Sequence, residues 1–242
     1  MKNRIFEIII VTLLLVGCGN INVINHIKPE LNVEFSSFEK AGCLPQEGNI
    51  YICDIGSDLY KLGCDQIKPA SEMLGGFSPG LPMAVCLFKP LEHKEMGNLY
   101  DLPKNEYFYN AGGLYPILQR YIVFVDEKFR IIRNLDELKA YFAPVESENE
   151  ALSFAIASKR IFTAYDQKMN KNYKYYVDTL EDSFVEEIDG GFIVHSFAYN
   201  YYGCGSHYTY ALEVKVSSDG NIDELKSTEI FKDPAEDDLC RD

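Results

Sequence analysis

The sequence predicts an α+β fold: a loop-rich, disulfide-stapled N-terminal part, then a helix packed on an antiparallel β-meander of about four strands. Three observations lead to this prediction. Six cysteines follow residue 40, a helix-capping motif stands at residue 147, and apolar residues alternate with polar ones after residue 183. Because the helix precedes the alternating segment, we expect it to cover one face of the sheet, as in two-layer α+β domains.

The best-marked helix begins with the capping box Ser147-Glu148-Asn149-Glu150. In this motif the serine and glutamate side chains each accept a hydrogen bond from a backbone N–H at the helix start. Apolar residues at 151, 152 and 154–156 follow with helical spacing. We therefore expect a helix with one apolar face that reaches Arg160.

A series of strands follows this helix. Asp189-Gly190 and Asp219-Gly220 are strong signals for tight hairpin turns. Apolar residues alternate around these turns, most clearly in residues 206–216, so that one face of the strand is apolar and the other polar. We expect strands at 183–188, 191–199, 206–216 and 222–231.

The chain divides into a Cys-rich α+β region, residues 35–145, and a region of helix and antiparallel sheet, residues 146–242. Glycine and proline residues between 75 and 82 indicate turns in the first region. Short apolar runs there predict strands at 49–53 and 83–88. A hairpin at 121–125 and 129–133, and a short helix between Asn134 and Pro144, complete the first region.

The amino terminus has the pattern of a secretory signal. Lys2 and Arg4 precede an apolar run of nine residues, 8–16. At 1.5 Å per residue such a helix is about 14 Å long, too short for a hydrocarbon core of about 30 Å. The run ends in Leu15-Val16-Gly17-Cys18, which resembles the lipobox of bacterial lipoproteins.

The resemblance implies how the chain is processed and where it resides. Residues 1–17 are expected to be removed as the signal peptide, and Cys18 to carry acyl chains such as palmitate. Residues 18–34 are then expected to form a tether between the lipid and the folded part. Two or three acyl chains hold a protein on a membrane nearly permanently, so the membrane is an expected partner.

Three further fragments are similar to uncharacterised bacterial envelope lipoproteins. They are Leu62-Gly63-Cys64-Asp65, Gly203-Cys204-Gly205-Ser206-His207 and the segment 142–155. The likeness implies a place in the cell envelope and no particular activity. The expected site is the outer membrane if the organism has one, and otherwise the outer face of the cell membrane.

The charge of the chain limits its partners. The net charge is −14, and removal of residues 1–17 takes away two basic residues and one acidic residue, which makes it −15. Nucleic-acid binding needs lysine and arginine to displace counterions from phosphates, so we expect no nucleic-acid partner. The acidity permits a cationic protein partner. One hypothesis is therefore an acidic inhibitor of a cationic host enzyme.

The cysteines other than Cys18 are even in number, which in an exported chain is typical of three disulfides. Six cysteines allow fifteen connectivities. Four lie within residues 43–86 and two near the end, which favours the pairs Cys43–Cys53, Cys64–Cys86 and Cys204–Cys240. We find no metal-ligand spacing and no cofactor-binding motif, so we expect neither a metal nor a cofactor.

Two groups of residues are candidates for function. Tyr201 and Tyr202 lie at an expected turn, where exposed tyrosines make good binding surfaces. Cys204, His207 and His195 are candidates for a thiol nucleophile with its base. A binding or structural role for an anchored envelope lipoprotein is the leading hypothesis, and a thiol-dependent hydrolase or transferase is its rival.

Overall fold

A computed structural model describes residues 21–90, 105–110 and 116–241 of the chain. The predicted signal peptide and Cys18 lie outside the described residues. The described part is a mixed α+β structure in which most strands are antiparallel. None of its helices is long and apolar enough to cross a membrane. The helices are α1 (Ser36–Glu39), α2 (Asp58–Lys61), α3 (Leu135–Phe142), α4 (Glu148–Ser158) and the 3-10 helices η1 (Glu72–Gly76) and η3 (Pro234–Glu236).

The N-terminal half contains a seven-stranded antiparallel sheet with the order β2-β3-β4-β5-β7-β6, in which β8 also pairs with β7. The sequence predicted a loop-rich segment here with strands at 49–53 and 83–88, and it missed two further strands before residue 90. Both contain proline, which removes a strand N–H and weakens the strand signal. The strands are β2 (Cys43–Gln46), β3 (Ile50–Cys53), β4 (Gln66–Pro69), β5 (Met83–Phe88), β6 (Tyr109–Asn110), β7 (Leu118–Val125) and β8 (Lys128–Ile132).

The C-terminal half contains a five-stranded antiparallel sheet with the order β11-β12-β14-β15-β9. The prediction of a meander of about four strands was too narrow, because the short strand β9 adds a fifth at the edge. In β14 the expected alternation holds from Leu212 to Val216, where Leu212, Val214 and Val216 are buried and the residues between them half-buried. It fails at the start of the strand, where Thr209 is buried, because the register with β15 shifts between Thr209 and Tyr210. The strands are β9 (Lys174–Tyr175), β11 (Phe184–Ile188), β12 (Gly191–Tyr199), β14 (Tyr208–Ser217) and β15 (Ile222–Lys232).

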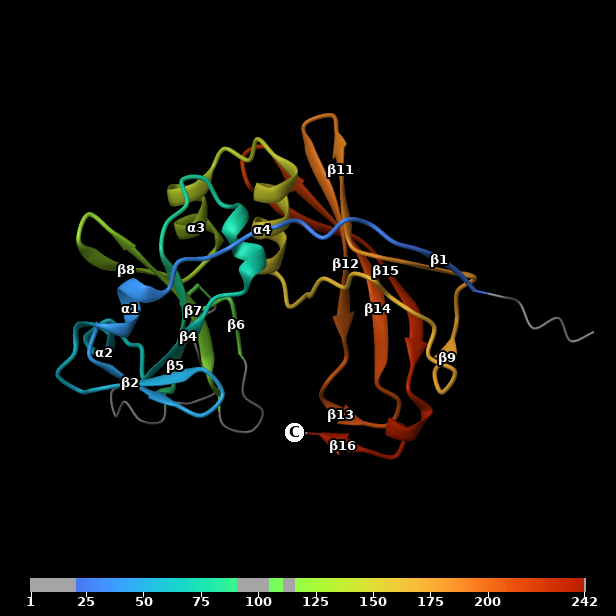
Figure 1. Cartoon of the computed structure of the whole chain (residues 1–242), viewed down its shortest axis with the longest axis horizontal. Coiled ribbons are helices and arrows are strands. Elements are labelled where there is room, and N and C mark those ends of the chain that lie inside the picture. The colour runs from blue at the N-terminus through green and yellow to red at the C-terminus, as the bar shows by residue number, and fades with distance from the viewer. Residues whose placement is uncertain (1–20, 91–104, 111–115, 242) are drawn as a thin grey trace, which may run out of the picture.

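Helix α4 lies between the two sheets (Figure 1). Its capping box forms in a shifted version: the Ser147 hydroxyl accepts the Glu150 N–H at 3.3 Å, while the Glu150 carboxylate accepts the N–H of Glu146, one residue before the cap, at 2.7 Å. The helix ends at Ser158 and not at Arg160. Every residue from Glu150 to Ala157 is buried, so the expected single apolar face was wrong. A helix that is buried all round needs a partner on each side, and α4 has one sheet on either side.

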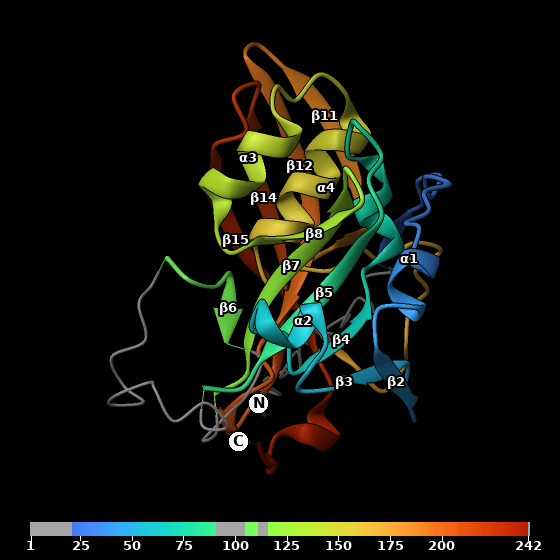
Figure 2. The ribbon, with the colours of Figure 1, turned by 90° about the vertical axis from the view of Figure 1, so that its left-hand side faces the viewer.

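One hydrophobic cluster contains side chains from both sheets and from α4. It includes Val85 and Val123 from the N-terminal sheet, Phe154 from α4, and Val194 and Val214 from the C-terminal sheet. Figure 2 shows the strands of the N-terminal sheet in front of those of the C-terminal sheet. The two regions that the sequence predicted on either side of residue 145 therefore share one apolar core.

Residues 21–34, which we call the strap, run along the body from one half to the other (Figure 1). The sequence predicted a tether at 18–34, but the described part of it is bound. Strand β1 (Asn22–Ile24) pairs in parallel with β10 (Thr179–Glu181). At the other end, Asn32 lies so close to Gly75 that a Cβ added to Gly75 would be 2.4 Å from the backbone oxygen of Asn32. Backbone pairing and close packing therefore bind the strap to the body. The local sequence pattern of the strap is too weak to predict either contact.

Three disulfides connect the six cysteines of the described residues: Cys43–Cys53, Cys64–Cys86 and Cys204–Cys240. These are the pairs that clustering along the sequence favours. Cys43 lies opposite Cys53 on β2 and β3, and the first four cysteines are buried around a second hydrophobic cluster. Cys204 lies opposite Cys240 on two short paired strands, β13 (Gly203–Cys204) and β16 (Cys240–Arg241), so this bond ties the C-terminal segment to the 200–206 loop.

Candidate functional site

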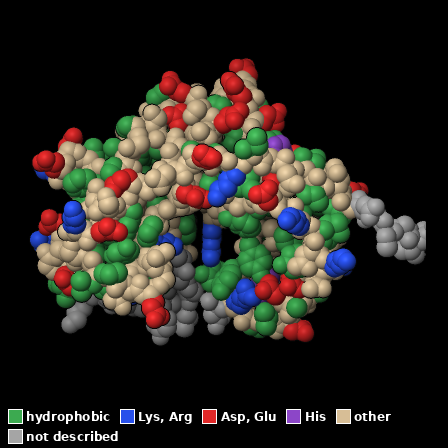
Figure 3. All heavy atoms as spheres, in the orientation of Figure 1, with side chains coloured by type: hydrophobic (Ala, Val, Ile, Leu, Met, Phe, Trp, Pro, Cys, Tyr) green, Lys and Arg blue, Asp and Glu red, His purple; other side chains and the backbone are tan. Residues whose placement is uncertain are grey.

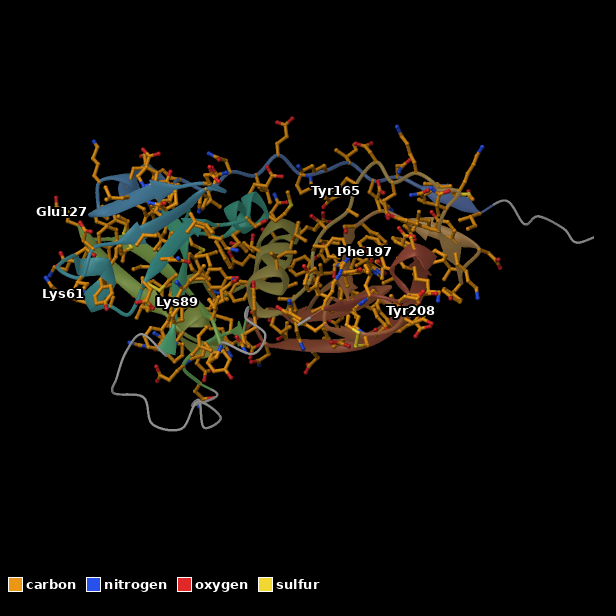
Figure 4. The ribbon with its side chains drawn as sticks, turned by 90° about the horizontal axis from the view of Figure 1, so that it is seen from below. Lys61, Lys89, Glu127, Tyr165, Phe197 and Tyr208 are labelled. Atoms are coloured by element: carbon orange, nitrogen blue, oxygen red, sulfur yellow. A yellow bond between two sulfur atoms is a disulfide. The ribbon has the colours of Figure 1, made fainter. Side chains whose placement is uncertain are left out.

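A cleft of about 450 Å³ opens between the two halves, beside the C-terminal end of α4. Figure 3 shows the molecule hollowed between its halves at this place, with basic side chains inside the hollow. Seen from below, Lys89 and Tyr208 lie on opposite sides of α4 (Figure 4). The volume falls in the range of small-molecule sites, about 300–1,000 Å³. The lining comes from β4 and η1 with their connection, from β5, β6 and β7, from Ile156 of α4, and from residues 161–163.

The floor of the cleft is a buried hydrogen-bonded network. The Gln119 amide donates to the Tyr121 hydroxyl at 3.3 Å, and the Tyr121 hydroxyl donates to the carbonyl of Ala157 in α4 at 3.1 Å. Gln119 and Tyr121 are almost wholly buried. Burial raises the pKa of the Tyr109 hydroxyl at the cleft wall, against a hydrogen bond from Gln119 and the positive charge of Arg160. The tyrosines are therefore neutral hydrogen-bonding groups at physiological pH.

The predicted tyrosines form a cluster with two arginines, one of which, Arg160, also acts electrostatically on Tyr109 in the cleft wall. The Arg160 guanidinium lies 4.7 Å from the centre of the Tyr202 ring, and the Arg241 guanidinium lies 4.9 Å from the Tyr201 ring. The two tyrosine rings meet edge to face at 5.3 Å, and Tyr201 is 47% exposed. Arginine over an aromatic face is attractive by about 0.5–1 kcal/mol at exposed sites. We call Arg160, Tyr201, Tyr202 and Arg241 the tyrosine–arginine cluster.

A scan against protein-family models and searches of curated proteins and of solved structures found no match to this chain. The geometry of the site therefore carries the functional argument alone.

The three candidates for thiol catalysis are not brought together. Cys204 is bonded to Cys240 and offers no thiolate. His207 is 1% exposed, and its ring nitrogens face two backbone carbonyls, Asn200 O at 2.9 Å and Leu239 O at 3.3 Å. These contacts hold the 200–206 loop against the C-terminal segment, which is a structural task. The prediction that Cys204 and His207 form a nucleophile and its base is thus contradicted by the bonding of both residues.

His195 lies elsewhere, on the face of the C-terminal sheet that points away from α4. Its ring stacks on Phe184 at 4.0 Å, and Phe184 stacks on His26 of the strap at 4.5 Å. His195 lines a smaller pocket of about 220 Å³ that also contains Asp182 and Lys226. The stack joins strap, β11 and β12, and it shares no residue with the cleft.

Sequence analysis missed most residues of the cleft. Lys68, Tyr109 and Gln119 lie on three separate strands, and only the pairing order of the sheet brings them together. Arg160 lies two residues after the end of α4, and the sequence predicted only that the helix would reach it. No motif marks these residues, because each is an ordinary strand or loop residue in its local context.

A thiol titration checks the assignment of Cys204. In denatured but unreduced mature protein we expect no free thiol, because all six cysteines of the described residues are bonded. After reduction we expect six, since a thioether at Cys18 does not react. Any free thiol before reduction contradicts the assignment, and peptide mass spectrometry then identifies the cysteine that carries it.

Proposed function

We propose that this chain is a lipid-anchored protein of the bacterial envelope that binds a partner through the cleft and the tyrosine–arginine cluster, without covalent catalysis. One observation carries the binding proposal: a preformed cleft of about 450 Å³ has a buried, hydrogen-bonded floor, and the nearby Arg160 stacks on Tyr202. Rigid aromatic side chains contact a ligand at low entropic cost. The only cysteine nucleophile that the sequence suggested is consumed in a disulfide.

The strap supports close attachment to the membrane. Strand β1 begins at Asn22, four residues after Cys18. Four residues span at most about 14 Å. Because β1 is paired with β10, the end of the molecule that carries these two strands is expected to face the bilayer closely. Strand β1 lies on the side of the C-terminal half (Figure 1), whereas most of the cleft lining comes from the N-terminal sheet, so we expect the cleft to stay accessible away from the bilayer.

Cys18→Ser tests the anchoring part of the proposal. We expect the variant to lose lipid attachment and to move from the membrane fraction to the soluble fraction, because no described helix is long and apolar enough to retain it. The measurement is membrane retention with metabolic labelling by palmitate, in cells with and without globomycin. Asn20→Ser serves as the matched control and is expected to stay on the membrane. Unaltered processing and retention of Cys18→Ser contradict the proposal.

Because the chain is acidic, a cationic protein is one partner that it could bind. The hypothesis of an acidic inhibitor of a cationic host enzyme stays a prediction, and binding that is insensitive to salt contradicts it. The cleft itself has basic residues in and next to its lining, although the whole chain is acidic.

A further inference from the structure

The cleft carries positive charge that no described carboxylate compensates. Lys68 lines the cleft, and Arg160 directly precedes the lining residue Ile161 and acts electrostatically on Tyr109 in the cleft wall. Within residues 21–90, 105–110 and 116–241, neither Lys68 nor Arg160 takes part in an ion pair. In a chain of net charge −14, two unpaired cations beside one cleft are an unexpected arrangement.

The one carboxylate in the described cleft lining already has a cationic partner. Glu72 is the only acidic residue that lines the cleft among the described residues, and it pairs with Lys28 of the strap. The C-terminal end of α4 adds a partial charge of about −0.5. Two full positive charges outweigh that partial charge, so the cleft is locally positive.

The rest of the lining suits an apolar group next to the charge. Met73, Leu74, Val85 and Ile156 are apolar residues of the lining, and each is more than nine-tenths buried. The Tyr109 hydroxyl, the Gln119 amide and the Thr163 hydroxyl supply a few hydrogen-bonding groups. Small-molecule sites typically combine a mostly apolar lining with a few well-placed polar groups.

We propose that the cleft binds a small organic anion, with its carboxylate or phosphate between Lys68 and Arg160 and its apolar part against Met73 and Ile156. A guanidinium presents paired N–H donors that match the two oxygens of such a group. This inference rests on the proposed binding function and gives the class of ligand.

The test uses the lipidated protein in neutral phosphatidylcholine nanodiscs and four probes of similar shape. Two probes are anionic, 4-phenylbutyrate and phenyl phosphate. One is neutral, 4-phenylbutanol, and one is cationic, 4-phenylbutylamine. Binding is measured by calorimetry and by ligand-observed NMR. We expect at least one anion to bind tenfold or more tightly than the alcohol, and the amine to bind most weakly. The anion that binds more tightly shows whether the natural ligand carries a carboxylate or a phosphate.

Variants separate the charge from the cleft. The double variant Lys68→Gln with Arg160→Gln is expected to remove the preference for the anion, and Lys171→Gln, an exposed lysine in the loop before β9, is the matched control. Thr163→Trp is expected to fill the cleft and abolish binding of every probe. Equal binding of all probes that is lost in Thr163→Trp contradicts the anion class but leaves the proposed function standing. Absence of binding by every probe, or binding that Thr163→Trp does not change, contradicts both.

Discussion

Replacing Asp182 by alanine is expected to destabilise the protein by about 3 kcal/mol or more and to release the strap from the body. Asp182 is only 1% exposed. Alanine leaves three backbone N–H groups without their acceptor, and each such loss costs about 1–3 kcal/mol when water does not replace it. The carboxylate accepts hydrogen bonds from the Asn25 amide at 3.0 Å and from the N–H groups of His26 at 3.2 Å, Asp166 at 2.8 Å and Gln167 at 3.1 Å.

The stabilising effect of Asp182 depends on pH in a defined direction. Burial alone raises the pKa of its carboxyl, but the hydrogen bonds that it accepts outweigh burial and hold that pKa below its ordinary value. A lowered pKa in the folded state means that folding favours the ionised form. The contribution of Asp182 is therefore complete above the ordinary aspartate pKa of about 3.9, and it is lost as the pH falls through the lower folded-state value.

Urea unfolding at pH 7 and at a series of acidic values measures this contribution. The difference in free energy of unfolding between the native chain and Asp182→Ala is expected to be largest at neutral pH and to shrink in acid. Asp178→Ala, an exposed carboxylate next to β10, is the control and is expected to change stability by less than about 0.5 kcal/mol. Amide exchange is expected to speed up at His26 in the Asp182 variant alone. A loss below 1 kcal/mol, or one that is constant with pH, contradicts this account.

The sequence predicted best where local rules decide the structure. Asn134 caps α3 through its side chain, which accepts the Glu137 N–H at 3.0 Å, and the Ser147 capping box opens α4. The hairpin turn before β8 forms at Asp126-Glu127, both of which adopt positive φ. Strand β5 has the predicted bounds, Met83–Phe88. In each case the signal and the structure lie within a few residues of one another.

The predictions failed where distant segments determine the structure. The strap forms β1 only because β10, more than 150 residues later, supplies a pairing edge. Helix α4 is buried all round only because two sheets meet on it, and the spacing of its apolar residues predicts an ordinary amphipathic face in isolation. Of the candidate site, Tyr201 and Tyr202 were predicted from their place at a turn. Lys68 and Gln119 were not, because sheet order and not local sequence brings them to the cleft.

Gly76→Ala is expected to destabilise both halves of the protein together, by about 3 kcal/mol or more. A Cβ at Gly76 would lie 2.1 Å from the carbonyl oxygen of Asn149 and 2.7 Å from the Ser153 hydroxyl. The first of these is backbone of α4, which no side-chain rotation relieves. The Gly76 N–H donates to the Ser153 hydroxyl at 3.1 Å, and that hydroxyl donates to the Met73 carbonyl at 2.7 Å, so the methyl group also separates a buried hydrogen-bonded contact.

The loss is expected to appear as one cooperative transition, because η1 belongs to the N-terminal half while α4 packs against the C-terminal sheet within the same apolar cluster. Gly80→Ala is the matched control, since a Cβ there meets no atom within 4 Å. Chemical unfolding followed by hydrogen exchange with peptide mass spectrometry measures each half separately. If the C-terminal sheet of Gly76→Ala keeps the native midpoint while the N-terminal half unfolds earlier, the halves are independent domains divided near residue 145. Coincident transitions show instead that α4 belongs to both halves, and that the cleft beside its C-terminal end has a geometry fixed by the fold as a whole.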